Sequence, residues 1–351
     1  MGSTGAVTAE RTGERHGVAD ASGLAILAAC AAWALIASGV GGGRPDGVLL
    51  AILAVAAGYA GGRIAGALLP VAAPCAGALA GVCLAAAAPH VTPGPASSAP
   101  LGPIGATAAL LSLSAGAVCC AAWAARGPAL RLCLRLAAVG VVCCAALLGS
   151  TAGFLACAGI LLCSLAGALT RRAPGLAGFA LAAVLVAGAS WAVAEEVLPR
   201  GLTASLEGQL GPHRVGLWRD AGDLAGAHPA FGVGPGRFGD ASPTVTEGLL
   251  PDDKPHSALL QQAAEQGFTG VVLLTAAFGW VLFALWRSPR STAVVLTAGA
   301  ALTAVAAVAT LGNALSVTSV TAGAGLLAGI ATARPLPEGR ETGSGETDRL
   351  P

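Results

Sequence analysis

The chain has 351 residues, of which 55% are hydrophobic and only 11% are charged, and its formal net charge is +1. Soluble domains carry about 25% charged residues, so the composition excludes an ordinary soluble protein, and no basic patch points to nucleic acid. Apolar runs near the length of a bilayer-spanning helix recur along the chain. The sequence therefore predicts an all-α polytopic membrane protein.

The ten cysteines all lie within apolar runs, and none lies in a polar segment. A disulfide framework would place them in loops, and the adjacent pairs Cys119-Cys120 and Cys143-Cys144 lack the spacing of zinc sites. We interpret them as small apolar packing residues.

About ten membrane spans are predicted, seven of them in an N-terminal bundle over 23–194 and the rest over 267–333. Glycine-rich breaks at 41–43 and 61–62 separate the first three. Their approximate ranges are 23–39, 46–60, 64–88, 104–124, 132–149, 151–170, 175–194, 267–286, 292–311 and 314–333.

Arginines in the short loops predict the orientation, because such residues favour the cytoplasmic side. With ten spans they share one side with the polar tails 1–22 and 334–351, which we expect to be disordered and cytoplasmic. The 90–103 loop and the large 195–266 loop then face outward. These arginines are Arg63, Arg126, Arg131, Arg135, Arg171, Arg172, Arg287 and Arg290.

The first motif of the large loop is a predicted amphipathic helix over 213–227, which lies against the membrane or against the top of the bundle and which Pro229 ends. Taken alone, Arg214 and Trp218 would suit a helix lying at the membrane surface, with the Trp as an anchor and the Arg near lipid headgroups. Its apolar face carries Arg214, Leu217, Trp218, Ala221, Leu224 and Ala225.

The second motif, residues 229–238, reads Pro-Ala-Phe-Gly-Val-Gly-Pro-Gly-Arg-Phe. A dinucleotide-binding loop needs GxGxxG spacing between a strand and a helix, and this segment has neither. Alternating Gly232, Gly234 and Gly236 predict a tight loop whose backbone closely approaches another segment. Two interpretations remain: a structural turn, or a loop whose N–H groups and Arg237 hold an anion.

The third motif is a predicted helix that opens at Pro255 and runs into the next span, with Gly267 and Gly270 at the junction. His256 then lies at the start of this helix near the outer membrane surface. A lone histidine there is commonly just solvated, and the functional interpretation is a general base that works near neutral pH.

In this order, Arg214-x3-Trp218, the 229–238 glycine motif and His256-Ser257-x9-Gly267-x2-Gly270 resemble the O-antigen ligase / O-antigen polymerase family. The resemblance implies a membrane glycosyltransferase similar in architecture to GT-C enzymes. Such proteins move a glycan from an undecaprenyl-pyrophosphate carrier to an acceptor hydroxyl on a lipid, glycan or protein at the outer face of the cell membrane. Neither a cofactor nor a metal is implied.

The resemblance also implies roles for individual residues. His256 would take the acceptor proton, while Arg214, and more weakly Arg237, would bind the pyrophosphate, which suits the guanidinium fork. The loop backbone at Gly232, Gly234 and Gly236 would assist. The supporting residues would be Trp218, Ser257, Glu265, Gly267 and Gly270.

One position departs from the family pattern. Thr151, in Ser150-Thr151-Ala152-Gly153, stands where a second arginine is expected at the outer end of a span. Arg44 or Arg200 would have to substitute for it, or the enzyme is altered. Two alternatives to a polysaccharide ligase or polymerase therefore remain: a non-catalytic scaffold of the same family, and a transporter, although most spans carry no ionisable residue.

Overall fold

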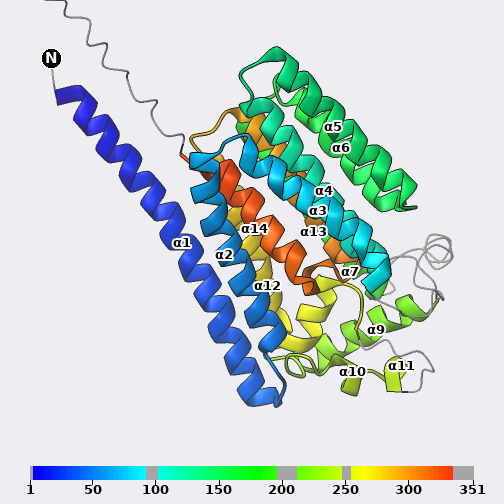
Figure 1. The fold of residues 1–351 in the computed structure, drawn as a ribbon. Coiled ribbons are helices and arrows are strands. Elements are labelled where there is room, and N and C mark those ends of the chain that lie inside the picture. Colours follow the sequence, from blue (N-terminus) through cyan, green and yellow to red (C-terminus); the bar gives the residue numbers. More distant parts are fainter. Residues whose placement is uncertain (1–2, 92–101, 196–211, 247–253, 335–351) are drawn as a thin grey trace, which may run out of the picture.

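A computed structural model describes residues 3–91, 102–195, 212–246 and 254–334, and every regular element in these ranges is a helix. Residues 92–101 of the predicted 90–103 loop, residues 335–351 of the predicted tail and Arg200 lie outside these ranges, and the ends of the predicted loop belong to helices α3 and α4. Figure 1 shows the long helices side by side in one bundle, with short helices gathered at one end.

Each of the ten predicted spans corresponds to a helix in the described ranges. Among the residues that the structure describes, seven helices are long and apolar enough to cross a membrane, and α3, α6 and α14 are shorter apolar helices. The bundle helices are α1 (Ser3–Gly41), α2 (Asp46–Leu68), α3 (Ala72–Val91), α4 (Gly102–Ala124), α5 (Pro128–Leu147), α6 (Thr151–Ala166), α7 (Arg172–Ala194), α12 (Ala258–Trp286), α13 (Thr292–Leu311) and α14 (Thr318–Thr332).

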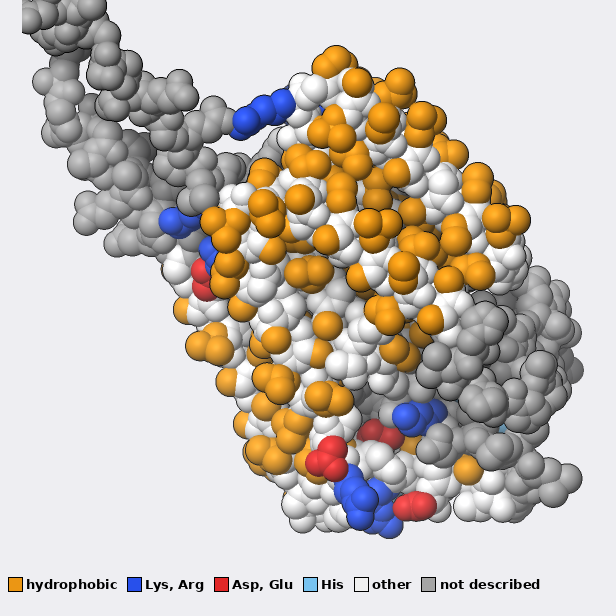
Figure 2. Space-filling view, viewed as in Figure 1, with side chains coloured by type: hydrophobic (Ala, Val, Ile, Leu, Met, Phe, Trp, Pro, Cys, Tyr) orange, Lys and Arg blue, Asp and Glu red, His pale blue; other side chains and the backbone are white. Residues whose placement is uncertain are grey.

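Helices α4 and α13 form the centre of the bundle. Most of their side chains are buried, whereas few of the side chains in the spans of α1, α2, α5 and α7 are buried. Figure 2 shows the same distribution on one face, where hydrophobic side chains cover the bundle and charged ones lie near its two ends. An apolar exterior of this kind belongs in lipid, so the chain is a polytopic membrane protein.

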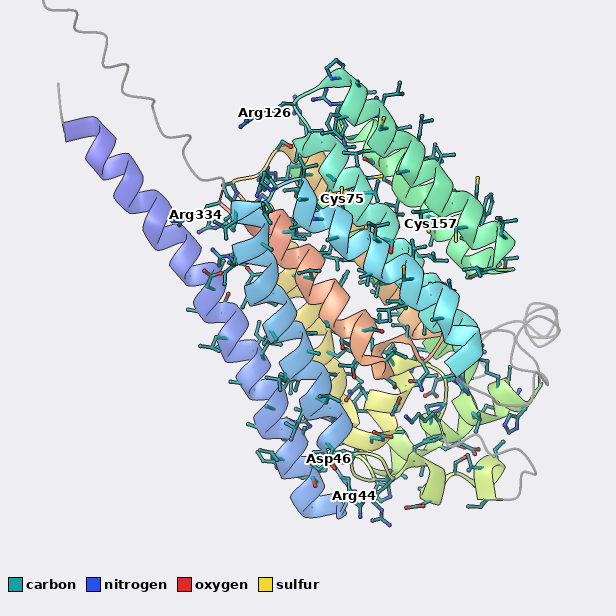
Figure 3. All side chains as sticks on the ribbon, in the orientation of Figure 1. Arg44, Asp46, Cys75, Arg126, Cys157 and Arg334 are labelled. Carbon is teal, nitrogen blue, oxygen red and sulfur yellow. The ribbon has the colours of Figure 1, made fainter. Side chains whose placement is uncertain are left out.

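The two ends of the bundle differ. What we call the site end carries α9 (Pro212–Ala227), α10 (Phe238–Ala241) and α11 (Pro243–Thr246), together with Arg44, which is labelled in Figure 3. The opposite, arginine end carries Arg126 and Arg334, as labelled in Figure 3. Arginines there also cross-link helix ends: Arg172 donates to the Ser288 carbonyl at 2.7 Å, and Arg290 donates to the Gly66 carbonyl at 2.6 Å.

The prediction of disorder for residues 1–22 is wrong for most of that range, because α1 begins at Ser3. This stretch contains no proline, and its Ala, Glu and Arg residues favour a helix. Its last part is also held by the bundle. Trp280 donates its indole N–H to the Ala19 carbonyl at 2.8 Å, and Asp20 pairs with Arg63.

The expected break at Gly61-Gly62 is also wrong, since α2 runs through these glycines and ends at Leu68, before Pro70. Here glycine serves close packing rather than a turn: α2 and α14 lie against one another along parallel glycine stripes. A Cβ on Gly62 would lie 2.2 Å from the Leu326 carbonyl oxygen. Small residues at helix contacts let backbones approach closely in membranes.

All ten cysteines are free thiols within helices, as the apolar-packing interpretation predicts.

The helix contact predicts different effects for two neighbouring glycines. Gly62→Ala should lower the melting temperature of the detergent-purified protein, because overpacking costs about 1–3 kcal/mol. Gly61→Ala is the matched control, since a Cβ there meets nothing within 4 Å. Equal melting temperatures for the two variants would contradict the contact.

Candidate active site at the loop end of the bundle

Helix α9 is the predicted 213–227 helix, and it packs on the bundle as a buried element. Its side chains Val215, Leu217, Trp218 and Ala221 join Val193 and Ala194 of α7, Phe238 of α10, and Leu260 and Ala264 of α12 in one apolar cluster. The predicted apolar face is therefore confirmed. The interpretation of this helix as a surface anchor is wrong, because Trp218 is only 1% exposed and Arg214 only 8%.

Arg214 and Trp218 hold the histidine turn, which we define as residues 255–257. The Trp218 indole N–H donates to the Pro255 carbonyl at 2.7 Å. The Arg214 Nη2 donates to the His256 carbonyl at 3.2 Å, and also to the carbonyl of Leu311 at the end of α13. A cation at a helix C-terminus is favourable, so Arg214 joins α9, α13 and the histidine turn.

His256 stands outside the helix it was predicted to start. Its φ of 50° makes it the single non-glycine residue with a positive φ among the described residues. Helix α12 begins two residues later, with Ser257 as the N-cap accepting from the Leu260 N–H at 3.4 Å. Serine outcompetes Pro255 as the start because its hydroxyl satisfies a free helix N–H. Positive φ at a bulky residue stores strain, and such residues cluster at functional sites.

The glycine loop, residues 229–237, lies against a kink in α12. Gly267 has φ 68° and ψ −171° inside the helix, a conformation that essentially only glycine adopts. At this kink the Phe268 N–H donates to the Pro229 carbonyl, and Val233 and Gly234 donate to the Ala264 and Glu265 carbonyls at 2.9 and 3.0 Å. The predicted close approach and the junction at Gly267 are both confirmed.

The loop backbone has little capacity left for an anion, which favours the structural-turn interpretation. The N–H groups of Gly232, Val233, Gly234 and Arg237 all donate to protein carbonyls. Arg237 itself is half exposed and donates to the Gly41 carbonyl at 2.6 Å. Gly236 also lies next to the turn between α1 and α2, because a Cβ on it would be 3.6 Å from the Arg44 carbonyl oxygen. The loop thus ties α12 to the turn between α1 and α2.

The remaining supporting residues lie along α12. Glu265 is 4% exposed and accepts from the Gln261 side chain at 3.1 Å. Gly270 follows one turn after the kink, where a Cβ would lie 2.6 Å from the Gln266 Cβ. Glu265 lies beside the glycine loop, since its carbonyl accepts from the Gly234 N–H, whereas Gly270 gives room to neighbouring side chains of α12.

Sequence reasoning missed two residues that fix this framework. Asp220 of α9 accepts from the Ser242 hydroxyl and, at 2.9 Å, from the Thr244 N–H, which pins α11 to α9. Trp33 of α1 donates to the Gln266 carbonyl at 3.1 Å and stacks on Phe231. Asp220 could have been noticed in the sequence, because it is a carboxylate that lies outside the apolar face of the predicted 213–227 helix. Nothing in the sequence indicates that Trp33 contacts Gln266.

Thr151 lies at the same end of the bundle as the histidine turn. It is the first residue of α6, its side chain is exposed, and Ser150 is the N-cap. A Cβ on Gly153 would lie 3.3 Å from Ala108 of α4, and one on Gly105 would lie 3.8 Å from Gly312, next to Leu311. Arg44, a candidate to replace the arginine expected at Thr151, has its backbone in contact with Pro235 and Gly236. It therefore lies near Arg237.

Within the described ranges, His, Cys, Asp and Glu side chains do not gather in groups of three that could hold a metal ion.

These contacts define a class of protein: a polytopic membrane protein with a helical site at one end that holds a histidine and an arginine on adjoining segments. The O-antigen ligase family model matches residues 136–275, from α5 to the middle of α12, so this membrane protein contains an O-antigen ligase domain. The match includes all three motifs that carried the resemblance, which is confirmed. No curated protein and no solved structure matches the chain.

Gly267 is the position where the site's framework should be most sensitive. In Gly267→Ala a Cβ would lie 2.6 Å from the Pro229 and Ala230 carbonyl oxygens. Together with backbone strain of about 1–3 kcal/mol, this should lower the melting temperature and expose the glycine loop to protease. Gly279→Ala, in the same helix with nothing within 4 Å of its Cβ, is the control. An unchanged Gly267→Ala protein would contradict the kink.

Proposed function

We propose that the protein is a glycosyltransferase of the ligase or polymerase type that uses a polyprenyl-pyrophosphate-linked glycan as its donor. The observation that carries the proposal is the clamp of Arg214 and Trp218 on the His256 turn, inside a matched O-antigen ligase domain. The donor is already activated, so the chemistry needs a base and charge stabilisation rather than a redox group.

The proposed reaction is a direct displacement at the sugar's anomeric carbon. The acceptor hydroxyl oxygen forms the new glycosidic bond while the bond from that carbon to the pyrophosphate oxygen breaks. The imidazole of His256 takes the hydroxyl proton, and the lipid pyrophosphate leaves with the bonding electron pair. Arg214 stabilises the charge that develops on the leaving group.

The geometry supports these roles in two ways. His256 is partly exposed, and bonds to the carbonyls of Pro255 and His256 hold its backbone, so the position of its Cα–Cβ bond is fixed. Arg214 lies in contact with the same turn, and its Nη2 group is positioned by two carbonyls. Such preorganisation lowers the cost of reaching the transition state.

We further propose that the site end faces outward and that both termini are cytoplasmic. Arg63, Arg126, Arg172 and Arg290 lie at the opposite end, and short-loop arginines favour the cytoplasmic side. The carrier-linked glycan would then meet the site on the outer face of the cell membrane, where cell-envelope polysaccharide is assembled.

The proposal predicts that His256→Ala and Arg214→Ala abolish formation of the surface glycan in cells, while the amount of inserted protein stays unchanged. His228→Ala is the histidine control, because His228 is exposed at the end of α9. Arg214→Lys keeps the positive charge but removes the guanidinium fork that can bind two phosphate oxygens at once. This variant should retain only part of the activity. Glycan levels that are normal in both alanine variants would overturn the catalytic proposal.

Thr151 tests whether the departure from the family pattern matters. Thr151→Arg should fold normally, because the side chain is exposed and the N-cap is Ser150. It should keep activity and raise turnover, since an added cation at the site end of α6 stabilises the leaving pyrophosphate. Surface glycan and melting temperature are the measurements. A folded but inactive variant would count against an arginine role at this position.

A further inference from the structure

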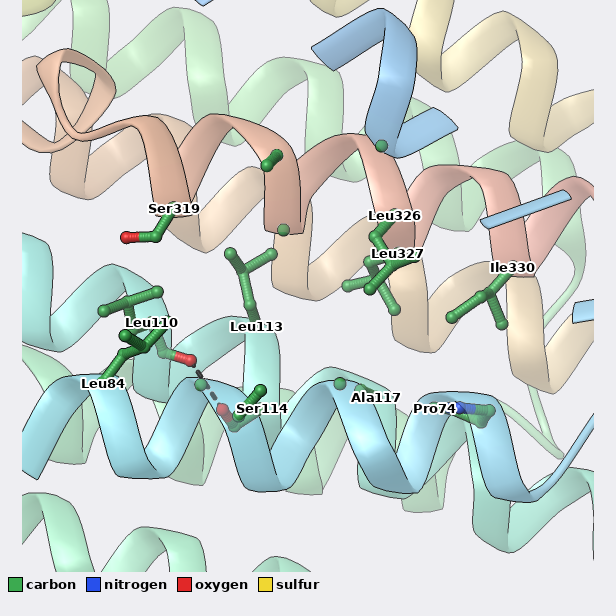
Figure 4. Close-up of a pocket in the computed structure, with 16 residues that line it drawn as sticks. Pro74, Leu84, Leu110, Leu113, Ser114, Ala117, Ser319, Leu326, Leu327 and Ile330 are labelled. Atoms are coloured by element: carbon green, nitrogen blue, oxygen red, sulfur yellow. Dashed lines mark hydrogen bonds between the residues drawn. The ribbon is translucent and has the colours of Figure 1, made fainter. Parts of the chain in front are cut away.

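An apolar groove of about 330 Å³ runs between α3, α4 and α14, with α2 behind it. Figure 4 shows the facing helices and the side chains that line the groove. Small residues contribute from several sides, so the space is wide. The lining includes Gly58 of α2, Gly77, Ala80 and Gly81 of α3, Leu110 and Ser114 of α4, and Ser319, Gly323 and Leu326 of α14.

The polar atoms of the groove are few. The Ser114 hydroxyl already donates to the Leu110 carbonyl at 2.8 Å, so it adds little polarity. The groove is also open to the surroundings, because Leu84 on its edge is 48% exposed and Ala80 is exposed. An open apolar groove on a membrane-spanning bundle favours a hydrocarbon chain.

One end of the groove adjoins the site end. Ser319 is the second residue of α14, and η1 (Ala314–Ser316) joins α14 to α13. The last residue of α13 is Leu311, whose carbonyl accepts from Arg214. A single short connection therefore separates the groove from the guanidinium that we assign to the pyrophosphate.

The groove also has the length of a lipid tail in one leaflet. From Ser319 to Ile330 along α14 is roughly 16 Å at 1.5 Å per residue. Half of a bilayer's hydrocarbon core is about 15 Å thick. A molecule with its charged head beside Arg214 would therefore reach the bilayer midplane with its tail in the groove.

We propose that this groove binds the isoprenoid chain of the polyprenyl-linked donor. The inference rests on the proposed function, because that function places the pyrophosphate at Arg214. The many glycines and alanines favour a methyl-branched chain, which needs more width than a linear acyl chain. Each buried methylene adds to binding, so the groove would contribute affinity and fix the direction in which the head enters the site.

The test uses a polyprenyl monophosphate with a photoreactive diazirine in its isoprenoid chain, added to the full chain in phosphatidylglycerol vesicles. Irradiation and peptide mapping should place the label on the groove-lining segments of α3 and α14. Unlabelled polyprenyl monophosphate should compete, whereas additional phosphatidylglycerol should not. Labelling spread over the outward faces of α1 and α5, or equal competition by phosphatidylglycerol, would overturn the proposal.

Two exposed alanines one turn apart on α3 provide the matched variants. Ala80 lines the groove, and Ala76 does not. Ala80→Phe should weaken probe binding about tenfold, the effect of displacing about two buried methylenes, and Ala76→Phe should leave it unchanged. Ala80→Leu replaces Ala80→Phe if the latter lowers the melting temperature. Equal binding by the Ala80 and Ala76 variants would contradict the groove.

The failure of this inference is distinguishable from failure of the proposed function, because the probe carries no glycan to transfer. Groove labelling that persists in a folded protein without transferase activity would overturn the function alone. Transferase activity that depends on His256, without groove labelling, would overturn the groove alone.

Discussion

Irregular backbone that is buried between helices must have its carbonyls satisfied by the protein, because a buried carbonyl without a donor is costly. This chain meets the requirement with tryptophan and arginine side chains. Trp218 and Arg214 bond the carbonyls of the histidine turn, and Trp33 bonds the carbonyl before the α12 kink. At the other end Trp280 and Arg290 bond carbonyls within the helices α1 and α2, where they join neighbouring helices rather than mark a departure from helix. The donors at the site end thus fix where the chain departs from helix, and the candidate site is built from one such departure.

The strained position of His256 follows from this constraint. Its positive φ is tolerated because bonds to the Pro255 and His256 carbonyls and the Ser257 cap hold the turn on both sides. The glycine loop has a different role, since it joins the α12 kink to the α1–α2 turn and its alternating glycines serve packing. The histidine turn therefore presents the proposed base, whereas the glycine loop fixes the kink in α12. Together the two motifs hold α9, α12 and α13 around the proposed pyrophosphate position.

Periodicity predicted much of this fold, because apolar runs and the α9 face report burial directly. Three features escaped it. Whether a glycine breaks a helix or packs it depends on its partner, and Gly62 faces α14, which is distant in sequence. Pro255 and Ser257 both signal a helix start; the Ser257 hydroxyl caps α12, and Trp218 binds the Pro255 carbonyl outside the helix. The framework contacts of Trp33 and Asp220 are likewise tertiary. The three motifs of the predicted site all lie within the matched residues 136–275, whereas the burial of Arg214 and Trp218 required the structure.

The central claim is that the clamped histidine turn transfers glycan from a lipid pyrophosphate. The most direct measurement is release of free lipid pyrophosphate from a purified undecaprenyl-pyrophosphate-linked oligosaccharide in the presence of native membranes, with wild-type protein compared with His256→Ala. The account predicts release by the wild type and its loss in the variant, with both proteins folded. Equal release by the two proteins, or none from a folded wild type, would contradict it, and the latter result would favour a non-catalytic role in which Thr151 marks the missing cation.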